Sequence, residues 1–265
     1  MVKDNIGSIF SDDTYGDAAW DAYVSFTQPY KDLLPLTEPF IKKRLSNLRV
    51  YPEGKNRRAD MGQSQFVHHL MIYYWNGYLD LVDGGVIKTF FETADVKYRI
   101  EALHFIGFAL KEDKSETREE VLDRLKILWD YRLTDLVSSD KENQKELEEF
   151  GIWFASNAFS NDWAIANLQK VLVITQNANP DFMVLEKLCT MVEKYPVEAI
   201  ICLREMIAGA RERWSISSWK EYASIIIRIS FESGNSEVSR IAKAQVDILI
   251  SKGHHNFRNL VKKIK

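Results

Sequence analysis

Apolar residues recur every three or four positions along most of this sequence, the spacing that places side chains on one face of an α-helix. In the first half the pattern runs over residues 33–48, 66–75, 98–110 and 121–136, with a shorter stretch at 20–27. The run at 66–75 is apolar on most faces, so we expect that helix to lie at the centre of the fold. The pattern predicts an all-α protein.

The second half shows the same spacing organised in pairs of helices. The first helix of each pair begins near residue 146, 181 or 218, a separation of about 35 residues that is typical of two-helix repeats. One amphipathic pair cannot bury its apolar face alone, whereas a stack of pairs can. We therefore predict an α-solenoid of antiparallel helix pairs, HEAT- or TPR-like, forming an α-α superhelix. An irregular helical bundle without a true repeat is the alternative.

Local signals predict where several helices begin and end. Pro180 and Pro196 are expected at the first position of a helix, where the missing N–H does no harm, and Gly209 at the end of one. Three capping pairs are Asp60 with Gln63, Thr117 with Glu120, and Ser218 with Glu221. Loops are predicted at 50–56, 83–85, near 138–140 and at 233–235.

The chain is interpreted as a single helical-repeat domain, 1–265, with one possible division near residue 138. That division would separate N-terminal helices, 15–137, from C-terminal repeats, 140–262. Glycine (12 residues) and proline (6 residues) are both scarce, which favours long helices with short connections. The net charge of −3 argues against a dedicated nucleic-acid-binding protein, because such proteins carry a basic excess.

The sequence also bears on where the protein works. It has neither an N-terminal apolar leader nor an apolar stretch approaching the roughly 18 residues that span a bilayer. Cys189 and Cys202 lie in apolar helical stretches without metal-ligand spacing, so we interpret them as buried small hydrophobic residues in a reducing compartment. A disulfide or a reactive thiol is the alternative. We expect a cytoplasmic protein with no membrane partner.

The five histidines are the first candidates for chemistry, but their spacing does not favour a metal site. His68 and His69 are adjacent and therefore point about 100° apart on a helix, and the H-E-x-x-H pattern is absent. His104 lies among apolar residues, and His254 and His255 follow a glycine near a helix end, where a cation favours the helix dipole. The chain also lacks P-loop, G-x-G-x-x-G and G-x-S-x-G motifs. We predict no metal, no cofactor and no catalytic residue.

Basic and aromatic residues raise the question of nucleic-acid binding. We interpret the basic groups as solvated helix ends and loops, because the overall balance is acidic; a phosphate-binding face is the alternative. The groups are Lys42-Lys43-Arg44, Lys55 with Arg57-Arg58, Arg211 and Arg213 beside Trp214, and the tail residues Lys252, Arg258, Lys262, Lys263 and Lys265.

Two enzymatic alternatives remain open at this point. DNA glycosylases built from HEAT-like repeats use tryptophan, aspartate and arginine on a positive concave face, and Trp129-Asp130 with Arg132 invites that comparison. An ordinary amphipathic helix also explains these residues, as it does Trp153 and Trp163. A small-molecule enzyme would instead need a cavity in which His68, His69 or His104 meets acidic groups.

Four segments of the second half carry a resemblance to a known class of proteins. They are Phe150-Gly151-Ile152-Trp153-Phe154-Ala155, Asp162-Trp163-Ala164, Tyr195-Pro196-Val197-Glu198-Ala199, and Trp219 with Lys220-Glu221. They resemble the helical-repeat tails of large bacterial proteins in which the tail follows a STAND-type NTPase or Sir2-like domain, proteins often linked to anti-phage defence. The resemblance covers roughly residues 15–262 and implies an α-solenoid that acts as a scaffold or sensor. The enzymatic domain that accompanies such tails is missing from this sequence, so no catalytic residue can be carried over.

Our expectation is therefore a non-catalytic module that binds a protein partner, whose contacting residues the sequence leaves unknown.

Overall fold

The computed structural model describes residues 34–48, 57–112, 118–210, 216 and 218–262. All regular secondary structure within these ranges is helical, which confirms the prediction of an all-α protein. The contacts divide the chain into two compact units. Of the described residues, the first unit holds those up to 106 together with 118–128, and the second unit holds 107–112 together with 129–262.

The first unit is built around one long helix whose second half is largely apolar. It contains α3 (Leu34–Ser46), α4 (Arg57–Trp75), α5 (Val86–Thr93), most of α6 (Val96–Glu112) and the start of α7 (Glu119–Leu136). The residues of α4 that are 0% exposed are Phe66, Val67, Leu70, Met71, Tyr73 and Tyr74, as expected for a central helix. The Tyr74 hydroxyl donates to the backbone oxygen of Arg124 at 2.7 Å, which fixes α4 against α7.

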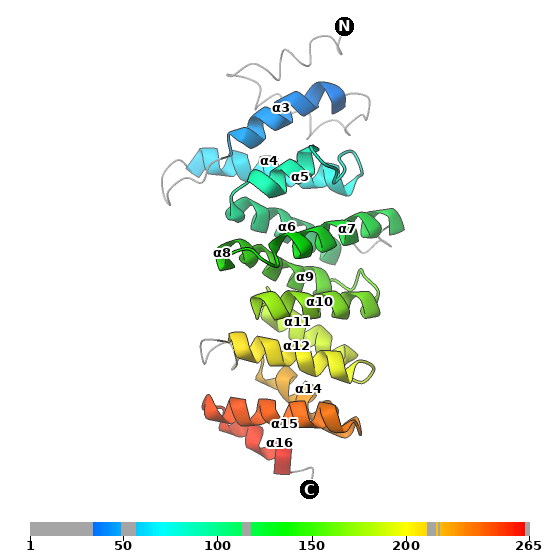
Figure 1. Cartoon of the computed structure of the whole chain (residues 1–265), viewed down its shortest axis with the longest axis vertical. Coiled ribbons are helices and arrows are strands. Elements are labelled where there is room, and N and C mark those ends of the chain that lie inside the picture. The colour runs from blue at the N-terminus through cyan, green and yellow to red at the C-terminus, as the bar shows by residue number, and fades with distance from the viewer. Residues whose placement is uncertain (1–33, 49–56, 113–117, 211–215, 217, 263–265) are drawn as a thin grey trace. The chain divides into compact units, whose positions relative to one another are not determined.

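The second unit contains the remaining helices. They are α8 (Lys141–Gln144), the 3-10 helix η2 (Lys145–Glu149), α9 (Phe150–Ala155), α10 (Asn161–Thr175), α11 (Asp181–Met191), α12 (Pro196–Gly209), α14 (Lys220–Glu232), α15 (Ser236–Ser251), η3 (His255–Phe257) and α16 (Arg258–Lys262). Here α9, α11 and α14 contact one another in that order, and so do α10, α12 and α15. Across these two rows, α9 packs on α10, α11 on α12 and α14 on α15, so this unit has two layers of helices (Figure 1).

An aromatic cluster fills the start of the second unit. The Trp129 ring stacks on Phe150 at 4.3 Å and meets Trp153, Phe159 and Trp163 edge-on at 5.2–6.0 Å. Such pairs add to the free energy gained by burying large rings. Through Trp129, the second half of α7 belongs to this cluster, and the division between the two units falls within α6 and within α7. The loop near residue 138 lies inside the second unit.

The local signals predicted some helix ends and misplaced others. Pro196 is the first residue of α12 and Gly209 the last, and Asn235 caps α15 by accepting from the backbone N–H of Glu237 and Val238 at 3.0 and 3.2 Å. Pro180 stands one position before α11, so its predicted place inside that helix was wrong.

Two predicted capping boxes are also wrong. The helix α4 begins at Arg57, so Asp60 lies inside it; the preceding Arg-Arg-Ala residues favour helix by themselves. The helix α14 begins at Lys220 with the buried Trp219 at its N-cap, so Ser218 lies one residue before the cap. The predicted cap at Thr117, the short helix at 20–27 and the loop at 50–56 lie outside the described residues.

Among the described helices, none combines the length and the apolar character that crossing a membrane would require.

Candidate functional site

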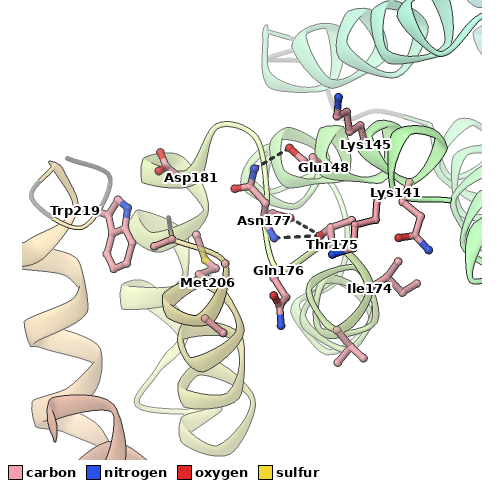
Figure 2. Close-up of a pocket in the computed structure, with 15 residues that line it drawn as sticks. Lys141, Lys145, Glu148, Ile174, Thr175, Gln176, Asn177, Asp181, Met206 and Trp219 are labelled. Atoms are coloured by element: carbon pink, nitrogen blue, oxygen red, sulfur yellow. Dashed lines mark hydrogen bonds between the residues drawn. The ribbon is translucent and has the colours of Figure 1, made fainter. Parts of the chain in front are cut away.

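A groove of about 670 Å³ lies at one edge of the second unit (Figure 2). Its walls are the α8–η2 segment, the end of α10 with the loop that follows it, the start of α11, the end of α12, and Trp219. The groove thus crosses elements from three successive helix pairs. Its volume is in the range of ligand pockets, about 300–1,000 Å³.

The α8–η2 wall presents two lysines to the groove. Asp140 caps α8 by accepting from the backbone N–H of Asn143 at 2.9 Å. The side-chain amide of Gln144 donates to backbone oxygens of the preceding loop at 3.1–3.4 Å, which holds that loop against α8. Lys141 and Lys145 are four residues apart, so they lie on the same side of this segment, and both are exposed.

The loop after α10 forms the floor of the groove and is tied to η2 by hydrogen bonds. Gln176 has a φ of 55°, which turns the chain sharply after the helix. The Asn177 side chain then donates to the Glu148 carboxylate at 2.7 Å, and the Asn179 side chain donates to Glu149 at 2.7 Å. Burial raises the pKa of Glu148, with the hydrogen bond from Asn177 opposing that shift and the Glu149 carboxylate adding to it.

The opposite wall is the end of α12. A Cβ added at Gly209 would lie 2.0 Å from the backbone oxygen of Gln176, so only glycine allows this close approach. Lys252 donates from Nζ to the backbone oxygens of Ile207 at 2.7 Å and Ala210 at 3.0 Å. This residue of the predicted basic tail therefore stabilises the end of a helix.

Trp219 closes one end of the groove. Its side chain is 1% exposed and lines the groove, yet no described residue accepts a hydrogen bond from its Nε1. A buried donor without an acceptor costs about 1–3 kcal/mol.

The histidines of the first unit occupy different surroundings. His68 stacks on Phe105 at 4.5 Å and lies 3.2 Å from a carboxylate oxygen of Glu101, which also accepts from Ser64 at 3.0 Å. His69 is buried, and burial, together with the charge of Arg44, lowers its pKa. The described part of the chain holds no group of three or more His, Cys, Asp or Glu side chains placed to bind a metal ion.

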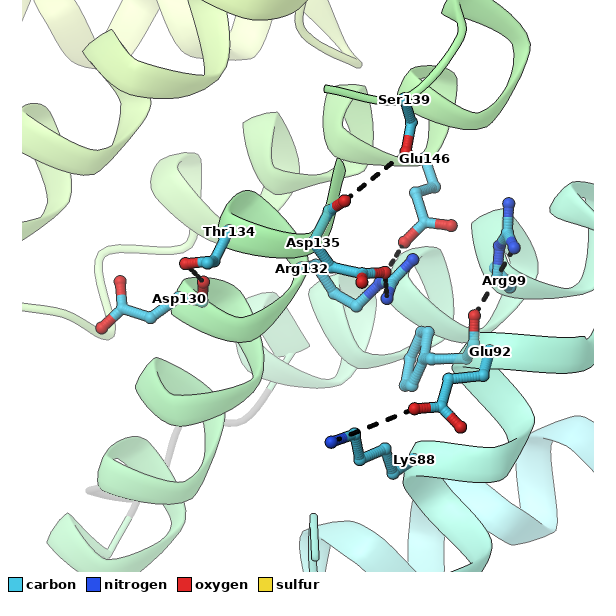
Figure 3. Close-up of polar contacts among 10 residues, drawn as sticks. Lys88, Glu92, Arg99, Asp130, Arg132, Thr134, Asp135, Ser139 and Glu146 are labelled. Carbon is cyan, nitrogen blue, oxygen red and sulfur yellow. Dashed lines mark hydrogen bonds and ion pairs between the residues drawn. The ribbon is translucent and has the colours of Figure 1, made fainter. Parts of the chain in front are cut away.

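The residues compared with a glycosylase site are separated by the fold. Trp129 lies in the aromatic cluster, and Asp130 is exposed. Arg132 is 0% exposed and donates to Glu146 at 2.5 Å and to Asp135 at 2.7 Å (Figure 3). The side chains of Trp129 and Arg132 are therefore buried, and of these three residues only Asp130 is exposed at the surface.

The remaining basic groups are placed as follows. Lys42 pairs with Glu38 at 2.8 Å, and the guanidinium of Arg44 lies 4.7 Å from the centre of the Phe66 ring. Arg258 is exposed. Outside the described residues are Lys55, Arg211, Arg213, Trp214, Lys263 and Lys265, and the side chains of Arg57, Arg58 and Lys262 are not described either.

The two cysteines are free thiols that burial makes less acidic. Cys202 is fully buried, and Cys189 is half-buried and donates to the backbone oxygen of Tyr222 at 3.3 Å. Burial raises the pKa of both thiols, that of Cys189 to about 11. Because the thiolate is the reactive form, neither cysteine is set up as a nucleophile.

One buried group was missed by the sequence analysis. Lys187 on α11 is 5% exposed, and its Nζ lies 5.0 Å from the centre of the Phe154 ring with no hydrogen-bond partner among the described residues. Burial lowers its pKa to about 8. Lys187 lies three residues after the buried Val184 and four before the buried Met191, which places it on the apolar face of α11. This helical spacing could have predicted its burial from the sequence.

Comparisons of the chain with protein-family models, with curated proteins and with solved structures find no match.

Proposed function

We propose that this chain is an α-solenoid of antiparallel HEAT- or TPR-like helix pairs that works as a non-catalytic scaffold or sensor for a protein partner. The contacts within the second unit support the repeat architecture. Its first-layer helices α9, α11 and α14 and second-layer helices α10, α12 and α15 each pack on the preceding member of the same layer. Stacks of this kind present extended surfaces suited to macromolecular partners.

The groove is the observation that carries the proposal. It is built from the loops and helix ends of successive pairs, so a partner lying in it would contact several repeats at once. Its lining includes charged side chains of both signs, the positive Lys141 and Lys145 and the negative Glu148 and Asp181. A balanced lining with amide groups suits a polypeptide better than a nucleic acid, whose backbone demands a basic excess.

The resemblance to tails of bacterial STAND-type or Sir2-like proteins supports the same role. In that setting the chain would act in the cytoplasm, as part of a larger defence-type assembly or beside one. Binding of a partner to the repeats would then regulate the activity of an effector domain.

The proposal is tested by affinity capture of the tagged chain from a lysate of its native host, with and without nuclease treatment. We expect a specific protein that is recovered equally in both samples and is absent with the tag alone. Recovery of nucleic acid, or the loss of the captured protein after nuclease treatment, would contradict the proposal.

A further inference from the structure

One buried cation distinguishes the contact between α9 and α11 from the other contacts among the paired helices. The buried residues of α9, α10, α12, α14 and α15 are all uncharged, whereas those of α11 include Lys187. This lysine is 5% exposed, and its Nζ lies 5.0 Å from the centre of the Phe154 ring on α9. The ammonium is therefore buried where α11 packs on the preceding helix of its layer.

No hydrogen bond or charge compensates the Lys187 ammonium. Its Nζ has no hydrogen-bond partner among the described residues, and burial alone lowers its pKa to about 8. The attraction of an ammonium to one aromatic ring recovers only part of the hydration that it loses on burial.

The ionisable groups around α11 leave Lys187 uncompensated because none of them shifts its pKa. The helix α9 has no ionisable side chain. The other elements that contact α11, and α11 itself, contribute Lys111 on α6, Asp181, Glu186 and Cys189 on α11, Glu198, Cys202, Arg204 and Glu205 on α12, and Lys220, Glu221, Tyr222, Arg228 and Glu232 on α14.

The starts of α9 and α11, in contrast, are tied by hydrogen bonds. The backbone N–H of Asn179 donates to the backbone oxygen of Glu148 at 2.8 Å, and its side chain donates to Glu149 at 2.7 Å. A Cβ added at Gly151 would lie 2.7 Å from the backbone oxygen of Asn179, so the two segments are in close contact here. Separation of the helices therefore costs least further along, where Phe154 meets Lys187.

We propose that the contact between α9 and α11 is a joint at which the second unit opens locally, and that the joint loosens when Lys187 carries its charge. Opening lets water reach the ammonium, which recovers hydration that an opened apolar contact does not gain. When Lys187 is neutral, this gain disappears and the contact stays closed. Elements that open at low cost are the ones that move when proteins bind or switch.

The direction of the pH dependence follows from the two protonation states. The pKa of Lys187 is about 8 in the closed joint, and hydration in the open joint returns it towards 10.5. The open state therefore binds more protons between these values, and its population falls as the pH rises from about 8 to about 10.5.

Amide hydrogen exchange of the full-length chain, followed by mass spectrometry at about pH 7, tests the joint. K187M keeps a similar side-chain shape without the charge, and K243M, which removes an exposed lysine of α15, is the matched control. We expect the amides of α9 and α11 to exchange about 10-fold or more slowly in K187M than in the wild type. The same amides in K243M, and the amides of α15 in both variants, should change by less than about 3-fold.

A second measurement at about pH 9 isolates the proton. The intrinsic exchange rate cancels in the ratio of the wild-type rate to the K187M rate at each pH. With a pKa of about 8 in the closed joint and 10.5 in the open one, this ratio should fall by about 3- to 10-fold between pH 7 and pH 9. Circular dichroism checks that both variants retain their helices.

Equal exchange of the α9 and α11 amides in the wild type and K187M would overturn the inference. The same slowing in every helix would also overturn it, because Lys187 would then act only on global unfolding. A ratio that is unchanged at pH 9 would exclude the proton as the cause. None of these outcomes involves a partner, so the joint and the scaffold function are tested separately.

Discussion

Replacing Lys187 by methionine should make the protein more stable. The lysine is 5% exposed, and burial lowers its pKa from 10.5 to about 8. A difference of that size corresponds to roughly 3 kcal/mol at neutral pH, where the folded protein must keep a buried ammonium charged. Methionine has a similar shape without the charge, and the lost contact with the Phe154 ring costs about 0.5–1 kcal/mol. We expect K187M to raise the free energy of unfolding by about 2 kcal/mol.

The pH dependence gives this prediction a second, independent readout. The pKa of Lys187 is lower in the folded chain than in the unfolded chain, so the unfolded state binds more protons between these two values. The penalty is therefore fully present below about pH 8, and it disappears as the pH rises towards about 10.5. The wild type should gain stability relative to K187M over this range.

Urea unfolding followed by circular dichroism at about pH 7 and about pH 10 measures both effects. The matched control is K243M, which removes an exposed lysine of α15 and should change the free energy of unfolding by no more than about 0.5 kcal/mol. The reasoning is refuted if K187M is no more stable than the wild type at neutral pH. It is equally refuted if the advantage of K187M persists unchanged at alkaline pH.

Three further predictions concern positions that the fold constrains. Gly209→Ala should lower the free energy of unfolding by about 1–3 kcal/mol, because the added Cβ would lie 2.0 Å from a backbone oxygen. Gly62→Ala should raise it by about 0.5–1 kcal/mol, because a Cβ there has nothing within 4 Å and alanine favours helix. Thermal or urea unfolding distinguishes the two signs. Arg132→Met should cost about 3–5 kcal/mol by leaving the buried Glu146 carboxylate without its main partner, and adding Glu146→Leu should recover most of that loss, which a double-mutant cycle measures. Cys202 should resist Ellman's reagent in the native protein and react once urea unfolds the chain, as followed by mass spectrometry; rapid labelling of the native thiol would contradict its burial.

Much of the helical structure could be predicted because the residues that favour a helix, and those that begin or end it, are close together in the sequence. The three-to-four-residue spacing of apolar side chains identified the α4 core and both helices of the last pair. Pro196 marked a helix start through its own backbone chemistry, which needs no distant partner. The loop predicted at 233–235 ends at Asn235, whose side-chain oxygen caps α15.

Helix starts that depend on distant packing could not be read in this way. The cap of α14 is Trp219, a buried residue whose side chain makes no capping hydrogen bond, and not Ser218, as the Ser-x-x-Glu spacing had suggested. The sequence also suggested a division at the loop near residue 138, whereas the packing of Trp129 on Phe150 brings the end of α7 into the second unit.

The sequence by itself determined the fold class, because the period of apolar residues and the scarcity of glycine and proline are properties of the chain alone. Only the tertiary structure decided the candidate site. Lys141 and Trp219 lie far apart in the sequence and meet at one groove because successive helix pairs place their ends along the same edge. Burial is likewise a property of the neighbours that surround a side chain, so the fold alone decided that Lys187 lies inside while Lys141 faces solvent.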